Sequence, residues 1–425
     1  MRSRESQPAE IVSAGSLSRL AHIRLACTWT GRMRTSLRTG REGVGPSASG
    51  FGSVGSLVVR AGPHRGICAR RAPSALRLAH VERSEVFRRT SYFGSLDGLR
   101  ALSILPVVWH HATSGPVPGV LGRGPLGVDL FFAISGFLIT TLLLREREKH
   151  GTIALGAFYA RRSLRIFPLY YVVLGAFALH ALLLRDAGPV REHFLRSLPW
   201  YATYTSNWFV DNAVPHAVVF SFAWSLATEE QFYLGFPWLL RVSKGVVPAA
   251  LFMALVVVVD QAAERDWLSF GPLVMRMLRS LATPIALGSL AALALRTRLF
   301  RAIDLVLGRR ESSLVLLALV LCGAVVPWSL LVVQVLMVGL VVACCLREDH
   351  SLASLLGARP LRGIGLVSYG MYMLNVPAIQ LAKRVVPQPF VFGVGLALSV
   401  ALAAAAHAAI ERPLQRLRAR FRPSM

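Results

Sequence analysis

From about residue 100 onward, apolar runs close to the length of a bilayer span alternate with short polar loops. About 20 consecutive apolar residues are enough for a helix to cross the hydrocarbon core of a membrane. The pattern predicts an all-α integral membrane protein, a bundle of about ten transmembrane helices. The ten predicted spans are residues 99–116, 126–144, 164–184, 221–240, 246–260, 273–295, 312–327, 329–346, 363–382 and 390–410.

The composition agrees with this class, because 54% of the 425 residues are hydrophobic, which is more than a soluble core of this size needs. Residues 1–90 differ: they are rich in Arg, Ser and Gly and contain no run long enough to span a bilayer. We expect a disordered extension at 1–90, a membrane domain at 91–413 and a basic cytoplasmic tail at 414–425. A transit peptide, or a translation start placed too far upstream, would give the same pattern at the amino terminus.

The net charge of the chain is +25, and after about residue 90 the basic residues lie mainly in the loops between the apolar runs. No stretch interleaves basic with aromatic residues as a groove for single-stranded nucleic acid requires, so no nucleic-acid partner is expected. Lys and Arg are concentrated in alternate loops, which by the positive-inside rule places both termini in the cytoplasm and the protein in the inner or plasma membrane. The five cysteines form no CxxC pair, so neither a metal site nor a disulfide framework is expected.

The first predicted span contains the most informative polar pair, Arg100 and His111. Eleven steps of about 100° come within about 20° of three full turns, so the two side chains share one helix face about 16 Å apart. A titratable side chain in an apolar helix is costly and usually functional. We interpret His111 as a buried base and Arg100 as the cationic mouth of its site.

Two further spans contain carboxylates. Asp129 lies near the outer end of the second span, where we expect it to orient or charge-balance His111. Glu229 and Glu230 are adjacent in the fourth span and therefore point about 100° apart. We expect only one of them to share a cavity with His111, and we assign that role to Glu229, where a carboxylate can pair with Arg or support a base.

Three arginines, Arg161, Arg162 and Arg165, cluster where the third span begins on the cytoplasmic side. Guanidinium groups bind phosphate in a bidentate way, so the cluster suits the phosphates of a nucleotide-bearing donor. Ordinary cytoplasmic anchoring explains the arginines equally well. On the opposite side, the aromatic residues of segment 185–220 fit either an interfacial belt or a platform for a sugar ring.

Six ordered blocks between about Ser95 and Pro413 resemble the acyltransferase 3 membrane proteins, which O-acylate sugars, polysaccharides and some small molecules. The blocks are Leu96-Asp-Gly-Leu-Arg100 with His111 after ten further residues, Gly127-Val-Asp-Leu-Phe-Phe132, Arg161-Arg-Ser-Leu-Arg-Ile-Phe-Pro168, Trp224-Ser-Leu-Ala-Thr-Glu-Glu-Gln-Phe-Tyr233, Ser368-Tyr-Gly-Met-Tyr372 and Glu411-Arg-Pro413.

The resemblance implies a ten-helix enzyme that transfers an acyl group, here taken as acetyl, from cytoplasmic acyl-CoA to a hydroxyl of a carbohydrate or similar acceptor. It also implies that His111, and not His110, is the essential histidine, and that Arg100 and the three arginines of the third span serve the CoA end. His111 would act as general base or as a transient acyl carrier. The alternatives are a transporter or flippase, whose polar groups also lie within a bundle, and an inactive scaffold.

One position departs from the family pattern, because Asn375 stands where the ninth span of the family usually has histidine. Asparagine forms hydrogen bonds but does not titrate, which puts a proton-transfer role at this position in question. Some relatives continue into a soluble esterase-like domain, whereas this sequence stops at Met425. We therefore expect a stand-alone membrane module.

Overall fold

The computed structural model describes residues 83–90, 92–113, 123–183, 188–210, 220–326 and 328–421. The regular structure within these ranges is entirely helical, which confirms the all-α class. The chain divides into two units, and the described residues all belong to the second, Arg71–Met425. Of the extension predicted for residues 1–90, residues 1–82 lie outside the described part.

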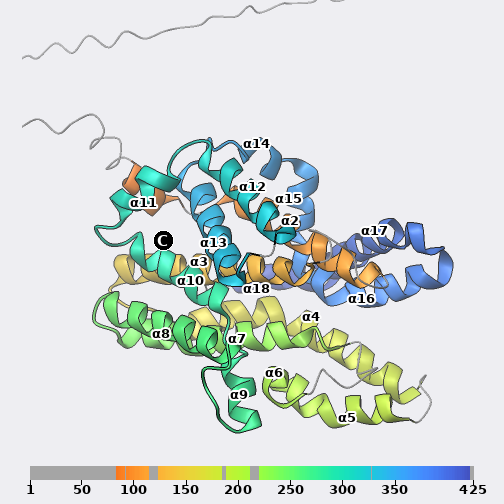
Figure 1. The fold of residues 1–425 in the computed structure, drawn as a ribbon. Helices are drawn as coiled ribbons and strands as arrows, with labels where there is room; N and C mark the ends of the chain where they lie inside the picture. Colours follow the sequence, from red (N-terminus) through yellow and green to blue (C-terminus); the bar gives the residue numbers. More distant parts are fainter. Residues whose placement is uncertain are drawn as a thin grey trace, which may run out of the picture. The chain divides into compact units, whose positions relative to one another are not determined.

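After a helical segment at residues 83–89, seventeen α-helices and one π-helical segment follow in the described part of the fold (Figure 1). They are α2 (Gly94–Ala112), α3 (Pro125–His150), α4 (Leu155–Leu183), α5 (Pro189–Ala202), α6 (Ser206–Phe209), α7 (Ala223–Val242), α8 (Val247–Glu264), α9 (Pro272–Leu278), α10 (Thr283–Ala294), α11 (Phe300–Leu307), α12 (Ser312–Val325), α13 (Leu330–Leu346), α14 (Ala353–Leu356), α15 (Arg359–Leu366), α16 (Ser368–Val385), α17 (Gln388–Ala406), η2 (His407–Glu411) and α18 (Arg412–Ala419).

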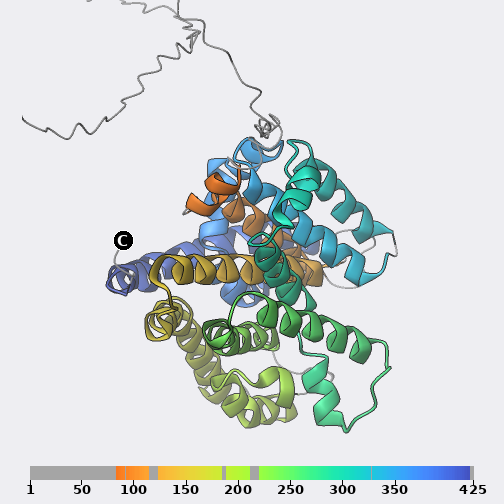
Figure 2. The ribbon, with the colours of Figure 1, turned by 90° about the vertical axis from the view of Figure 1, so that its left-hand side faces the viewer.

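Helix α3 lies at the centre of this unit, with the teal and light-blue helices α12 to α15 on one side and the green helices α5 to α9 on the other (Figures 1 and 2). Its closest neighbours are α10 and α2. Glycines permit this approach: a Cβ on Gly136 would overlap the carbonyl oxygen of Ile285 in α10, and one on Gly127 would overlap that of Ser103 in α2. Small residues at such crossings let helix backbones pack in direct contact, which is typical of membrane bundles.

Four continuous helical stretches in the described part are long and apolar enough to cross a membrane, namely α3, α4, α8 and the run Gln388–Ala419. Two bent pairs, α9 with α10 and α15 with α16, bring the number to six if each pair is one span. Helices α12 and α13 are apolar but shorter, and α2 and α7 are polar enough to fall outside this group. The structure thus supports a multi-pass membrane protein, while the number of ten spans stays a prediction.

Two of the predicted spans are broken helices. Residues 273–295 form α9 and α10, which meet at 40°, and residues 363–382 belong to α15 and α16, which meet at 77°. At the first break, Asp260 accepts hydrogen bonds from the backbone N (3.3 Å) and the Oγ1 (2.5 Å) of Thr283 and so caps the start of α10. At the second, Gly365 lets α15 press against the backbone of Asp97 in α2. A hydropathy pattern does not register such tertiary contacts.

The boundary of the amino-terminal extension needs a correction. Residues 83–89 are helical, and the Phe87 side chain is buried against Phe93, Phe137 and Phe300. Arg145 donates hydrogen bonds to the carbonyl oxygens of Phe87 (2.5 Å) and Thr90. This segment therefore belongs to the packed unit; its one large apolar residue is too weak a signal to be recognised in an Arg-rich sequence.

The contact between α3 and α10 gives a test of the packing. Gly136→Ala should lower the free energy of unfolding by about 1–3 kcal/mol, because the added methyl forces the two backbones apart. Gly175→Ala in α4 is the matched control, since no atom lies within 4 Å of its Cβ position, and it should leave stability unchanged or raise it slightly. Thermal unfolding of both variants in detergent checks this. Equal melting temperatures would show that the α3–α10 contact is not tight.

Candidate active site

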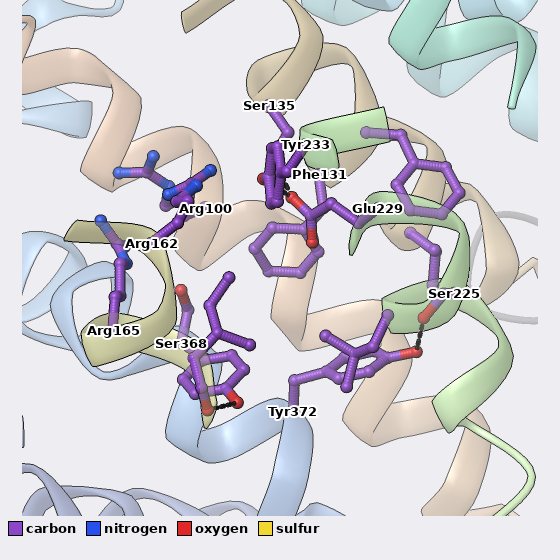
Figure 3. Close-up of a pocket in the computed structure, with 15 residues that line it drawn as sticks. Arg100, Phe131, Ser135, Arg162, Arg165, Ser225, Glu229, Tyr233, Ser368 and Tyr372 are labelled. Carbon is purple, nitrogen blue, oxygen red and sulfur yellow. Dashed lines mark hydrogen bonds between the residues drawn. The ribbon is translucent and has the colours of Figure 1, made fainter. Parts of the chain in front are cut away.

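A cavity opens between α2, α3, α4, α7 and α16 and contains most of the polar residues singled out in the sequence (Figure 3). Its lining combines three arginines, one carboxylate and several hydroxyl groups with apolar walls. The lining residues are Arg100, Val128, Phe131, Phe132, Ser135, Arg162, Arg165, Ile166, Ser225, Leu226, Glu229, Tyr233, Ser368, Tyr369 and Tyr372. An apolar pocket into which a few polar groups converge is typical of a small-molecule site.

One end of the cavity is cationic. Arg100 comes from α2, and Arg162 and Arg165 come from α4 one turn apart, so their guanidinium groups converge (Figure 3). Arg100 is held by Asp97, whose Oδ1 lies 2.9 Å from its Nη1. Arg165 has no hydrogen bond or ion pair within the described ranges, and the charges that act on it most strongly are those of Arg100, Arg162 and Arg418. Such a cluster favours an anionic ligand.

Arg162 links this cationic end to the carboxylate. Its guanidinium carbon lies 4.0 Å from the centre of the Tyr233 ring, a cation–π contact. The Tyr233 hydroxyl in turn donates a hydrogen bond to Glu229, and the Ser135 hydroxyl donates to the same carboxylate oxygen. These two hydrogen bonds, one from α3 and one from α7, hold the Glu229 side chain in a fixed orientation. Both donors and the carboxylate line the cavity.

The two adjacent glutamates separate as their helical positions predict. Glu229 lines the cavity, and Glu230 does not. The Glu230 Oε1 atom is buried with no hydrogen-bond partner in the described part of the chain. His111 is also absent from the cavity lining, so the expectation that Glu229 and His111 share one cavity is not met in this structure.

His111 is connected to the cavity through α16. Its Nδ1 lies 2.6 Å from Oδ1 of Asn375, a fully buried residue of that helix. Asn375 stands one turn after Tyr372, whose hydroxyl lines the cavity and lies 2.6 Å from the Ser225 Oγ. One face of α16 therefore runs from the cavity to His111, and the neighbouring His110 is exposed.

Asp129 does not pair with His111, contrary to our expectation. It accepts a hydrogen bond from Gln334 of α13 at 3.3 Å. The reason is the helix geometry: Gly127 faces α2, and Asp129, two residues later, points about 200° away from that face. Asp129 therefore belongs to the contact between α3 and α13.

Arg161 also lies outside the cavity. Its Nη2 pairs with Glu146 at 3.2 Å, and its Nη1 donates to the carbonyl oxygen of Phe421 at 2.6 Å. It follows that only two of the three clustered arginines, Arg162 and Arg165, line the cavity. The reason is that α4 begins at Leu155, earlier than predicted, so Arg161 and Arg162 already belong to a formed helix and point about 100° apart.

The hydroxyl groups of the cavity were not among the predicted site residues. Four of these residues lie in the sequence blocks described above, and membership of a block was the available signal: Ser225, Tyr233, Ser368 and Tyr372. No local sequence pattern marked Ser135 or Arg418 as a neighbour of the site. In the ranges that the structure describes, no three His, Cys, Asp or Glu side chains are grouped as metal ligands.

The chain is 38% identical over 160 residues to a Staphylococcus aureus (strain COL) protein named as a candidate O-acetyltransferase, a match covering 36% of this chain and 26% of that protein. It is 32% identical over 174 residues to the peptidoglycan O-acetyltransferase OatA of Listeria monocytogenes, a match covering 39% of this chain and 27% of that protein. It is 34% identical over 165 residues to the O-acetyltransferase OatA of Staphylococcus aureus, a match covering 37% of this chain and 26% of that protein.

These matches span about a quarter of the length of the relatives. No solved structure matches the chain significantly. The family comparison covers far more, because the pattern of the acyltransferase domain family, Acyl_transf_3, matches residues 93–408. This range includes all the helices that line the cavity. The chain therefore belongs to the acyltransferase domain family.

Proposed function

We propose that this protein transfers an acetyl group from acetyl-CoA to a hydroxyl of a cell-surface carbohydrate of the peptidoglycan class. The names of the two OatA relatives support acetyl as the group, and that of the Listeria monocytogenes protein supports a peptidoglycan-like glycan as the acceptor. The family and the apolar helices support a membrane location. CoA dependence and the roles of individual residues rest on the geometry of the site.

The observation that carries the proposal is the convergence of Arg100, Arg162 and Arg165 at one end of a cavity. CoA carries phosphate groups, and guanidinium forks match phosphate in charge and geometry. Arg100 pairs with Asp97, whereas Arg162 and Arg165 have no ion pair among the described residues. A cluster with such an excess of positive charge is costly to keep partly buried without an anionic ligand. We therefore place the donor's phosphates at this end and its acyl thioester deeper in the bundle, with the arginines facing the cytoplasm.

In the proposed reaction His111 serves as general base. The imidazole removes the proton of the acceptor hydroxyl as the oxygen attacks the thioester carbonyl. The carbon–sulfur bond then breaks, and the CoA thiolate leaves and is protonated by the imidazolium. Proton transfer of this kind usually accelerates a reaction by about 100- to 10,000-fold.

An acyl-imidazole on His111 is the alternative path. Acetyl-CoA with a radiolabelled acetyl group, incubated with the protein without acceptor and quenched rapidly, distinguishes the two. Label that stays on the protein and is absent from His111→Ala would favour the acyl carrier; release of CoA only when acceptor is present favours the general base.

The arginine cluster gives the first functional prediction. The double variant Arg162→Lys and Arg165→Lys keeps the charge but loses the planar fork, so the KM for acetyl-CoA should rise about tenfold or more while the acceptor KM stays nearly unchanged. Arg161→Lys is the matched control, because Arg161 pairs with Glu146 outside the cavity. Steady-state kinetics of purified protein in lipid nanodiscs measures both. An unchanged KM for acetyl-CoA in the double variant would assign the arginines to membrane anchoring.

His111 gives the second functional prediction. His111→Ala should abolish acetyl transfer while leaving membrane insertion intact, because the imidazole is half-buried at the end of α2 and its removal shortens no apolar run. The melting temperature should fall modestly, since Asn375 loses its hydrogen-bond partner. His110→Ala should retain activity within about threefold, since the His110 side chain is exposed and is a neighbour only. The assay follows labelled acetyl from acetyl-CoA into muropeptides. Full activity of His111→Ala would disprove the mechanism.

A further inference from the structure

The amide of Asn375 is held in one orientation by its own helix. Its Nδ2 donates hydrogen bonds to the carbonyl oxygens of Met371 at 3.1 Å and Tyr372 at 2.7 Å. The side chain is completely buried, so water does not compete for these bonds. Both amide hydrogens are therefore used, and Oδ1 is left facing Nδ1 of His111 at 2.6 Å.

A flipped amide does not satisfy this environment. It would place Oδ1 against two carbonyl oxygens, which have no hydrogen to donate, and would lose both backbone hydrogen bonds. Leaving such buried groups unpaired costs about 1–3 kcal/mol each. The backbone of α16 thus decides which end of the amide meets His111.

Because an amide oxygen only accepts, the hydrogen between the two residues must belong to the imidazole. We infer that Asn375 is a positioning residue that holds neutral His111 in the tautomer with hydrogen on Nδ1 and the lone pair on Nε2. A hydrogen bond from one ring nitrogen to an acceptor is a general means of fixing the tautomer of a catalytic histidine. That Nε2 then receives the hydroxyl proton rests on the function proposed above.

Among the described residues, no side chain other than Asn375 forms a hydrogen bond with His111. The titratable groups that act on it are His110, on its own helix, and Lys383 on α16, and no carboxylate among the described residues pairs with it. His110 is exposed, with its ring centre 5.6 Å from that of His111. The neutral amide of Asn375 is thus what selects the tautomer, in a position where the family pattern usually has a titratable histidine.

The tautomer is measurable without any enzymatic turnover. Protein with nitrogen-15 in its histidines, reconstituted in lipid bilayers at about pH 8, gives separate signals for protonated and unprotonated ring nitrogens. The His111 signals are those that disappear in His111→Gln. We expect a protonated Nδ1 and an unprotonated Nε2. In Asn375→Leu, which removes the acceptor, the hydrogen should shift partly or wholly to Nε2, and in Asn375→Asp it should stay on Nδ1.

Kinetics then connect the tautomer with catalysis. Asn375→Leu should lower kcat at least about tenfold with the acceptor KM within twofold, because the hydroxyl would meet a ring nitrogen that carries hydrogen for much of the time. Asn375→Asp should recover most of the lost kcat, because a buried carboxyl group is held protonated, so that one oxygen accepts the same Nδ1 hydrogen while the hydroxyl donates to the carbonyl oxygen of Tyr372 in place of Nδ2. Melting temperatures identify a variant that fails to fold; if Asn375→Leu does so, Asn375→Asp and the spectrum of the unaltered protein still decide the question.

The outcomes separate the two proposals. Hydrogen on Nε2 of His111 in the unaltered protein, or the same tautomer in folded Asn375→Leu, would overturn the positioning role of Asn375. Absence of acetyl transfer by the unaltered protein, together with hydrogen on Nδ1, would overturn the proposed function and leave the tautomer assignment standing. Loss of transfer in His111→Ala with an unchanged kcat in Asn375→Leu would contradict the positioning role alone.

Discussion

Direct backbone contact between helices is the constraint on which the site depends. Gly127 and Gly136 bring α3 against α2 and α10, and Gly365 brings α15 against α2. These contacts leave no room for side chains at the crossings, so the larger polar groups of α3 are displaced toward α4, α7 and α13. A polar group that faces the interior must find its partners there, because the hydrocarbon core offers none.

The polar side chains inside the bundle are held in place by contacts with one another. Glu229 is held by Ser135 and Tyr233, and Tyr233 also lies under the guanidinium of Arg162. This chain joins a carboxylate and a cation through one aromatic ring, so a ligand that displaces or attracts Arg162 also acts on the surroundings of Glu229. The cationic and hydroxyl-rich parts of the cavity are therefore coupled in structure.

Helix α16 connects the cavity with His111. Its face contains Ser368, Tyr372 and Asn375 in turn, and the 77° break from α15 sets the direction of that face. Since α15 is bound closely to α2 through Gly365, the orientation of α16 and the start of α2 depend on each other. The same helix that lines the cavity thus supplies the partner of His111.

The order of apolar runs in the sequence was sufficient to predict an all-α membrane protein. The 3.6-residue period was sufficient to separate Glu229 from Glu230, because this property depends on local geometry alone. Only the tertiary structure decided the partners: Asn375 for His111, Gln334 for Asp129 and Glu146 for Arg161. The rotation of each helix about its own axis selects these pairs, and for Asn375 the bend between α15 and α16 also contributes. They depend on contacts between helices distant in sequence, which no local pattern encodes.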